Sequence, residues 1–164
     1  MPDMQEVLDR ILKSFSSYYD VNTETPANPF VAEAVFSTKD EQYFLIKSAK
    51  LSESYSSEYV FFAHTDMLDE NKLDELDEKA WLEGLKRADV KENHKSTDVV
   101  LVILAEFFEK DIENKIKKKK HYKSYRFGLL GWSAYRLVAY ELSSGKTFSN
   151  GRGEDLKKLF CNIN

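Results

Sequence analysis

Four side chains of this sequence have the chemistry of metal ligands. His64 and Asp66 follow the apolar run of residues 60–63, and His94 and Asp98 stand just before a second apolar run. Imidazole nitrogens and carboxylate oxygens bind zinc, and a zinc with an open position activates water for hydrolysis. Two neighbouring strands would bring the four together. A metal-dependent hydrolase is therefore one hypothesis for the function.

The His64-x-Asp66 pair resembles the metal-binding motif of co-catalytic zinc aminopeptidases, in which the imidazole binds a zinc and the Asp often supports that His. The resemblance covers only these residues. Those enzymes have further carboxylate and His ligands at set spacings, and no matching series follows here. Asp66 can instead cap the next helix. We therefore predict no catalytic residues, no metal and no cofactor, and we favour a protein that is not an enzyme.

Charge is segregated along the chain. From Asp66 to Glu83 there are eight acidic residues and two lysines, a local balance of −6. An exposed carboxylate face can cover a basic protein surface through fast, salt-sensitive association, as in toxin-neutralising immunity proteins. Our first hypothesis is thus a non-enzymatic cytoplasmic protein that binds a protein partner through a charged face. The predicted acidic face consists of Asp69, Glu70, Asp74, Glu75, Asp77 and Glu78.

The opposite charge gathers between Lys110 and Arg126, where eight basic and two acidic residues give a balance of +6. Basic side chains interleaved with aromatic ones can hold phosphates and stack bases, so a further hypothesis is nucleic-acid or polyanion binding. Charge runs usually lie in solvent, however, and the two segments can simply face one another. The predicted polyanion site consists of Lys117, Lys118, Lys119, Lys120, Lys123, Arg126, Tyr122 and Tyr125.

The stretch from Thr97 to Ala105 is the element around which the chain is organised. Seven apolar residues follow Asp98 without alternation, which is typical of a strand covered on both faces. The patterns around it predict an α+β (mixed α/β) fold, a single mixed sheet with an N-terminal meander, flanked by helices in the order αβββαβαβββα. The predicted helices are 3–19, 70–88, 107–117 and 154–161, and the predicted strands are 29–36, 42–51, 58–65, 97–105, 121–130, 132–142 and 147–149.

Length and composition predict one domain over residues 1–164. An apolar share of 42% and a charged share of 32% are those of an ordinary globular protein. The single cysteine, Cys161, cannot form an internal disulfide. The N-terminus has no charged-then-apolar leader, and no apolar run approaches the length of a membrane span. We therefore expect a cytoplasmic protein without a membrane contact.

The order αβββαβ is similar to the core of restriction-endonuclease-like nucleases, which implies an acidic-x-Lys pair that holds Mg²⁺. The predicted strands offer Glu33 and Lys47 but no such pair, so the resemblance implies topology without the chemistry. Three segments resemble an uncharacterised family of small bacterial cytoplasmic proteins and imply no activity: His94–Thr97, Phe127–Trp132 and Asn150–Gly153. The last lacks the length and the Lys of a P-loop, so we expect a turn there.

Overall fold

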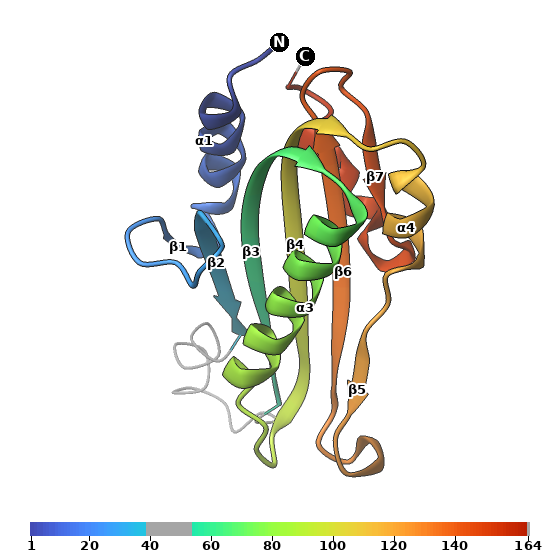
Figure 1. Cartoon of the computed structure of the whole chain (residues 1–164). Coiled ribbons are helices and arrows are strands. Elements are labelled where there is room, and N and C mark those ends of the chain that lie inside the picture. Colours follow the sequence, from blue (N-terminus) through green and yellow to red (C-terminus); the bar gives the residue numbers. More distant parts are fainter. Residues whose placement is uncertain (39–53, 164) are drawn as a thin grey trace.

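The protein is built on one mixed sheet with helices on both faces (Figure 1). The computed structural model describes residues 1–38 and 54–163. Its strands are β1 (Asp20–Asn22), β2 (Ala32–Ser37), β3 (Tyr55–Leu68), β4 (His94–Phe108), β5 (Tyr122–Ser124), β6 (Trp132–Glu141) and β7 (Thr147–Ser149). The helices are α1 (Met4–Phe15), α3 (Glu70–Arg87) and α4 (Ile112–Lys118), with two 3₁₀ helices, η1 (Arg126–Gly128) and η2 (Gly151–Phe160). The predicted α+β class is confirmed.

The strand order is β1-β2-β3-β4-β6-β5, and β7 pairs with β6 beyond the end of β5. β1, β2 and β3 form an antiparallel meander, whereas β3, β4 and β6 run parallel. The meander therefore exists, but its first strand, β1, lies between the predicted helix 3–19 and the predicted strand 29–36, where no strand was predicted. The predicted strand 42–51 lies outside the described residues.

β4 is the centre of the sheet, as predicted. Each residue from Val99 to Ala105 is at most 1% exposed, because β3 and β6 cover both edges and helices cover both faces. Val100, Val102 and Leu104 pack in the layer that contains α1 and η2, and the alternating residues pack in the layer of α3 and α4. The continuous apolar run is the consequence of this double burial.

The two longer helices begin at the residues that the sequence indicates. The Asp3 side chain accepts from the Glu6 amide at the start of α1, and Asp69 accepts from the Lys72 amide at the start of α3. Near its end, α3 lies close to β4: a Cβ added to Gly84 would stand 2.3 Å from a methyl carbon of Val99. The predicted cap Asp66 is wrong, because the side chain that accepts from the Lys72 amide is that of Asp69.

The largest disagreement concerns the predicted strand 121–130. Only Tyr122–Ser124 pairs, as β5, and the chain then turns through η1, where φ is positive at Arg126 (45°), Phe127 (55°) and Gly128 (88°). A left-handed backbone cannot continue a strand. Two smaller corrections concern the ends of helices: β4 continues through Phe108, so α4 begins only at Ile112, and the terminal helix is 3₁₀ rather than α.

Candidate functional site

The four predicted metal ligands do not come together. His94 begins β4, whereas His64 lies level with Leu104, ten residues further along the sheet. At about 3.3 Å per residue the two imidazoles are roughly 33 Å apart, and the same register separates Asp66 from Asp98 by roughly 26 Å. In residues 1–38 and 54–163, no group of three His, Cys, Asp or Glu side chains could hold a metal ion. The hydrolase site built on these four residues is thus excluded.

His94 is instead part of a buried polar network. Its Nδ1 lies 2.6 Å from the Leu130 carbonyl oxygen, and because a carbonyl only accepts, Nδ1 donates. Its Nε2 lies 2.8 Å from the Thr97 hydroxyl, which in turn is 3.2 Å from that of Ser57. The network joins β3, β4 and the segment before β6. The network has a structural role, since each of these polar side chains finds its hydrogen-bond partners within the fold.

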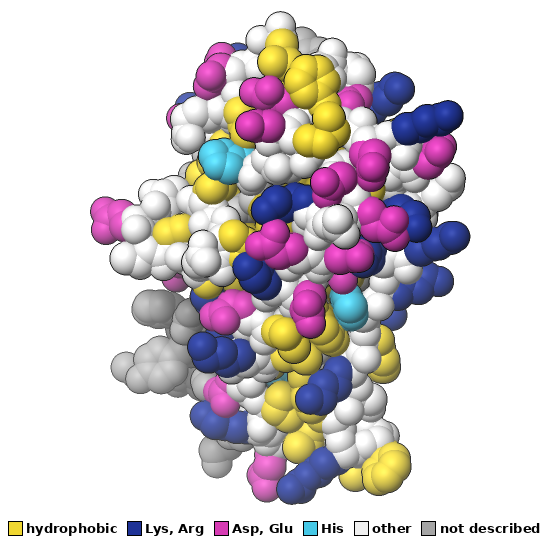
Figure 2. Space-filling model, in the orientation of Figure 1, with side chains coloured by type: hydrophobic (Ala, Val, Ile, Leu, Met, Phe, Trp, Pro, Cys, Tyr) yellow, Lys and Arg dark blue, Asp and Glu magenta, His cyan; other side chains and the backbone are white. Residues whose placement is uncertain are grey.

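The acidic and basic segments face one another. Lys115 from α4 lies 2.7 Å from Glu70 of α3, Lys119 pairs with Asp74, and His121 Nε2 lies 2.8 Å from Asp77 Oδ2. Figure 2 shows acidic and basic side chains interspersed over α3 rather than a uniformly acidic surface. Much of the charge predicted for a partner is therefore balanced within the molecule.

Asp77 is the most buried member of this contact. Burial favours its neutral form, but the hydrogen bond from His121 and the charge of Lys119 outweigh burial and hold the pKa of Asp77 below its ordinary value. The His121 ring stacks on Trp81 with 5.1 Å between ring centres. The Tyr135 ring also contacts His121, and burial and the Asp77 carboxylate raise the pKa of Tyr135 well above its ordinary value. Through these contacts of His121, the segment that precedes β5 is held against α3.

A second set of cations remains uncompensated. Among the described residues, Lys118, Lys120, Lys123 and Arg126 form no ion pair, in contrast to Lys117 and Lys119. Arg152, at the start of η2, is also exposed and without an ion pair in the described part of the chain. The predicted polyanion segment thus retains four free positive charges and gains a fifth from a distant part of the sequence.

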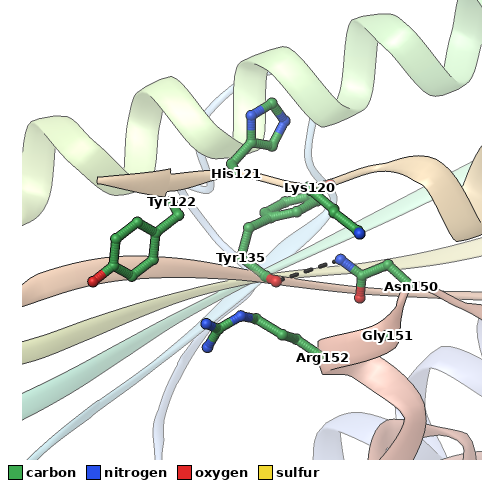
Figure 3. Close-up of a pocket in the computed structure, with 7 residues that line it drawn as sticks. All are labelled: Lys120, His121, Tyr122, Tyr135, Asn150, Gly151 and Arg152. Carbon is green, nitrogen blue, oxygen red and sulfur yellow. Dashed lines mark hydrogen bonds between the residues drawn. The ribbon is translucent and has the colours of Figure 1, made fainter. Parts of the chain in front are cut away.

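A cavity of about 510 Å³ opens where Arg152 approaches this segment. It lies at the outer edge of β6, in the interval between the residues that pair with β5 and those that pair with β7. Figure 3 shows Tyr122 and Arg152 entering from opposite sides, while His121 points away toward α3. The lining residues are Lys120, His121, Tyr122, Tyr135, Asn150, Gly151 and Arg152.

Asn150 holds the two walls of this cavity together. Its Oδ1 accepts from the amides of Leu137 (3.0 Å) and Gly153 (2.9 Å), and its Nδ2 donates to the carbonyls of Lys119 (3.0 Å) and Tyr135 (3.4 Å). The side chain thereby replaces the strand that β6 lacks between β5 and β7. The segment Asn150–Gly153, predicted to be a turn, is the capped start of η2.

Two exposed aromatic side chains stand beside the cavity on one face of the sheet. Tyr122 pairs with Ala134 and Ser124 pairs with Trp132, so Tyr122 and Trp132 are diagonal neighbours on the same face. Tyr122 is 59% and Trp132 36% exposed. The guanidinium carbon of Arg152 lies 5.9 Å from the centre of the Tyr122 ring, a cation–π distance. Tyr125, also predicted for this site, instead donates to or accepts from Ser133, 2.8 Å away.

A separate polar group lies under α1 and η2. Asp98 is adjacent to Glu58 in register, and burial raises the pKa of both carboxyls although Arg136 opposes the shift. The Tyr19 hydroxyl donates to Glu58 at 2.9 Å, and Arg136 binds Asp155. Tyr19, Glu58, Arg136 and Asp155 thus have partners within the fold, and the predicted ligand Asp98 lies beside them, where the charge of Arg136 favours its ionised form.

Glu33, the acidic residue of the nuclease resemblance, is also occupied. Its two carboxylate oxygens accept from the Arg87 guanidinium at 2.8 and 2.9 Å, and one of them also accepts from the Ala27 amide. Burial opposes ionisation, but these bonds hold the pKa of Glu33 below its ordinary value. Lys47 lies outside the described residues. Glu33 therefore ties β2 to α3 rather than holding a metal.

Five residues that line the cavity were not among the predicted site residues: Asn150, Gly151, Arg152, His121 and Tyr135. Trp132, the neighbour of Tyr122 in the sheet, was not predicted either. The Asn150–Gly153 turn was a visible signal for the first three, but their proximity to Lys120 depends on the pairing of β5, β6 and β7. Fold and cavity together define a mixed α+β protein with a cationic, aromatic site at a sheet edge. The family model described as "Domain of unknown function (DUF8052)" matches residues 3–162, and the chain belongs to this family. No curated protein and no solved structure matches this chain.

Proposed function

We propose that the protein binds single-stranded nucleic acid at the sheet edge formed by β5, β6 and the start of η2. The observation that carries the proposal is the meeting of uncompensated cations with exposed aromatic rings. Lys120, Tyr122 and Arg152 line the cavity, and the partly exposed Trp132 is the diagonal neighbour of Tyr122 on the same face of the sheet. Positive side chains that follow a backbone, together with rings on which bases stack, are the usual composition of such sites.

The cavity has the dimensions of a nucleotide-sized ligand site. Its volume of about 510 Å³ is within the range of small-molecule pockets. In the proposed complex, a phosphate lies between Lys120 and Arg152, and a base stacks on Tyr122. Trp132, the diagonal neighbour, takes the adjacent base. Lys118 and Arg126 contact the phosphates on either side, whereas Lys123, which pairs with Ser133, projects from the opposite face of the sheet.

The overall charge of the chain sets the strength of this binding. The sequence has a net charge of −4, so the field of the whole molecule does not attract a polyanion and only the local cations do. Affinity is therefore modest and falls steeply with salt, because counterion release supplies most of it. Stacking on Tyr122 contributes roughly 1–3 kcal/mol per base, which favours single strands over duplexes.

Fluorescence anisotropy with labelled single-stranded oligonucleotides at low salt tests the proposal. Tyr122→Ala should weaken binding about 5- to 150-fold, the equivalent of roughly 1–3 kcal/mol. Tyr18→Ala is the matched control, because Tyr18 is also an exposed tyrosine (76%) but lies after α1. Lys120→Gln and Arg152→Gln should each weaken binding, whereas Lys13→Gln on α1 should not. Equal affinity for all these variants would refute the proposal.

Two further ligands define the specificity. A duplex of the same sequence should bind more weakly, because its bases are not available to Tyr122 and Trp132. Heparin, a polyanion without bases, should be insensitive to Tyr122→Ala. If heparin and oligonucleotide respond equally to that variant, the site recognises charge alone and the stacking role is wrong.

The first hypothesis from the sequence, a protein partner at the acidic face, is the second candidate. Glu78 and the outer turns of α3 remain exposed, so a basic partner has a surface to contact. Glu70, Asp74, Glu75 and Asp77 already bind lysines of the chain itself, however, and would have to exchange partners. A complex with a basic protein that is abolished by Glu78→Lys, but not by Tyr122→Ala, would favour this candidate.

A further inference from the structure

The hairpin between β5 and β6 exposes two large apolar side chains at its tip. Phe127 is 104% and Leu129 81% exposed, and neither belongs to a core cluster of the described residues. Figure 2 shows hydrophobic side chains gathered at the end of the molecule that carries this hairpin in Figure 1. Single exposed apolar residues are common, but two together on a projecting turn require an explanation.

The tip is held in a defined and unfavourable backbone conformation. Arg126 and Phe127 both have positive φ, which costs a residue with a side chain on the order of 1 kcal/mol or more. Five backbone hydrogen bonds among residues 125–131 hold the turn, including those from the Tyr125 amide to Gly131 and from the Leu129 amide to Arg126. Such strain persists only where the surroundings impose it. The turn therefore presents Phe127 and Leu129 outward rather than letting them fold back.

Positive charge flanks these apolar side chains. Arg126 precedes Phe127 directly, and Lys123 lies three residues earlier with its ammonium 5.5 Å from the Tyr125 ring. Neither Arg126 nor Lys123 forms an ion pair with a described residue. Lys95 is also exposed. Its backbone lies beside the hairpin, because a Cβ added to Gly131 would stand 2.0 Å from the Lys95 carbonyl oxygen. The surroundings of the tip thus match an anionic surface.

We propose that the hairpin tip docks on an anionic lipid surface, with Phe127 and Leu129 entering the interfacial layer and Lys123, Arg126 and Lys95 contacting lipid phosphates. The shape of the tip favours lipid over a protein partner. A stable protein interface covers about 800 Å² on each side, far more than two side chains on a narrow turn provide. A lipid headgroup layer deforms around a small projection, and basic residues beside inserted apolar ones are typical of peripheral contacts.

This inference departs from the absence of membrane contact that the sequence suggested. None of the described helices combines the length and apolar character needed to cross a bilayer. Peripheral insertion of two side chains needs no span, because the rest of the chain stays in water. Two apolar side chains and three cations give weak, reversible binding, and loss of either set should nearly abolish it.

Sedimentation with lipid vesicles tests this inference without nucleic acid. The wild-type protein should bind vesicles that contain phosphatidylglycerol and not vesicles of phosphatidylcholine alone. The double variant Phe127→Ser/Leu129→Ser should lower the partition coefficient at least about tenfold, given the apolar area removed. Lys123→Gln/Arg126→Gln should lower it similarly and remove most of its salt dependence. Circular dichroism should show both variants folded, since the replaced side chains are exposed.

Two controls separate this inference from the proposed function. Leu82→Ser removes an exposed apolar side chain (56%) on α3 and should leave vesicle binding unchanged. Tyr122→Ala should weaken oligonucleotide binding and not vesicle binding. Vesicle binding that survives Phe127→Ser/Leu129→Ser would overturn the inference, as would a wild-type protein that fails to bind anionic vesicles at low salt.

Discussion

Replacing Asn150 by Ala should destabilise the protein strongly for so small a change, because the buried side chain makes four hydrogen bonds. The substitution removes the acceptor of two amides, Leu137 and Gly153, and the donor to the carbonyls of Lys119 and Tyr135. The Leu137 amide is left without a partner, which costs about 1–2 kcal/mol, whereas the Gly153 amide keeps its bond to the Asn150 backbone carbonyl (3.1 Å). The two carbonyls that lose a donor add a smaller amount, so the free energy of unfolding should fall by roughly 2–3 kcal/mol.

Urea denaturation followed by circular dichroism measures this loss. Asn114→Ala is the matched control, because Asn114 is exposed on α4 and its side chain makes no hydrogen bond with the described residues, so its unfolding free energy should change by less than about 0.5 kcal/mol. Asn150→Asp keeps the acceptor but places a carboxylate oxygen against the Lys119 and Tyr135 carbonyls, so at pH 7 it should destabilise at least as much as Ala. A loss below about 1 kcal/mol for Asn150→Ala would refute the view that this side chain replaces a missing strand.

Three further results follow from the packing and the ion pairs. Gly131→Ala should lower the unfolding free energy by roughly 3 kcal/mol in urea, because its Cβ meets the Lys95 carbonyl at positive φ, whereas Gly151→Ala, with open space, should cost under about 1 kcal/mol. The fold lowers the pKa of Glu33, so the ionised carboxylate stabilises the protein fully above pH 4.5 and this contribution is lost as the pH falls through the folded pKa. The difference in unfolding free energy between wild type and Glu33→Gln should therefore shrink as the solution is acidified. Burial raises the pKa of Glu58, so the unfolding free energy should fall as pH rises from 4.5 through the folded pKa. Glu58→Gln should reduce this dependence and leave the part that Asp98, whose pKa burial also raises, contributes.

The central strand was predictable because its environment leaves a direct trace in the sequence. A segment buried on both faces needs apolar residues at every position, and residues 99–105 satisfy that requirement. The start of α1 was equally local, because Asp3, the first residue of the predicted helix 3–19, caps it with its own side chain. The hairpin tip was not predictable, because Tyr125, Phe127 and Leu129 alternate with polar residues as in a strand. These apolar side chains are in fact exposed on a turn with left-handed backbone, and in the sequence only Gly128 and Gly131 indicate a turn instead of a strand.

The candidate site depends on contacts that no local pattern encodes. Arg152 reaches Tyr122 across 30 residues because β7 returns antiparallel to β6 and η2 starts beside β5. The same long-range geometry separates His64 from His94, since parallel strands place the end of one beside the end of the next. The sequence left open whether the acidic and basic segments face one another, and the structure shows that they do.

The salt dependence of oligonucleotide binding tests the central claim most directly. The logarithm of the association constant should fall linearly with the logarithm of salt concentration, and Arg152→Gln should reduce the slope by about 0.7, the loss of one phosphate contact to a single strand. Lys13→Gln should leave the slope unchanged. An identical slope for wild type and Arg152→Gln, or no binding by the wild-type protein at low salt, would contradict the assignment of this sheet edge as a nucleic-acid site.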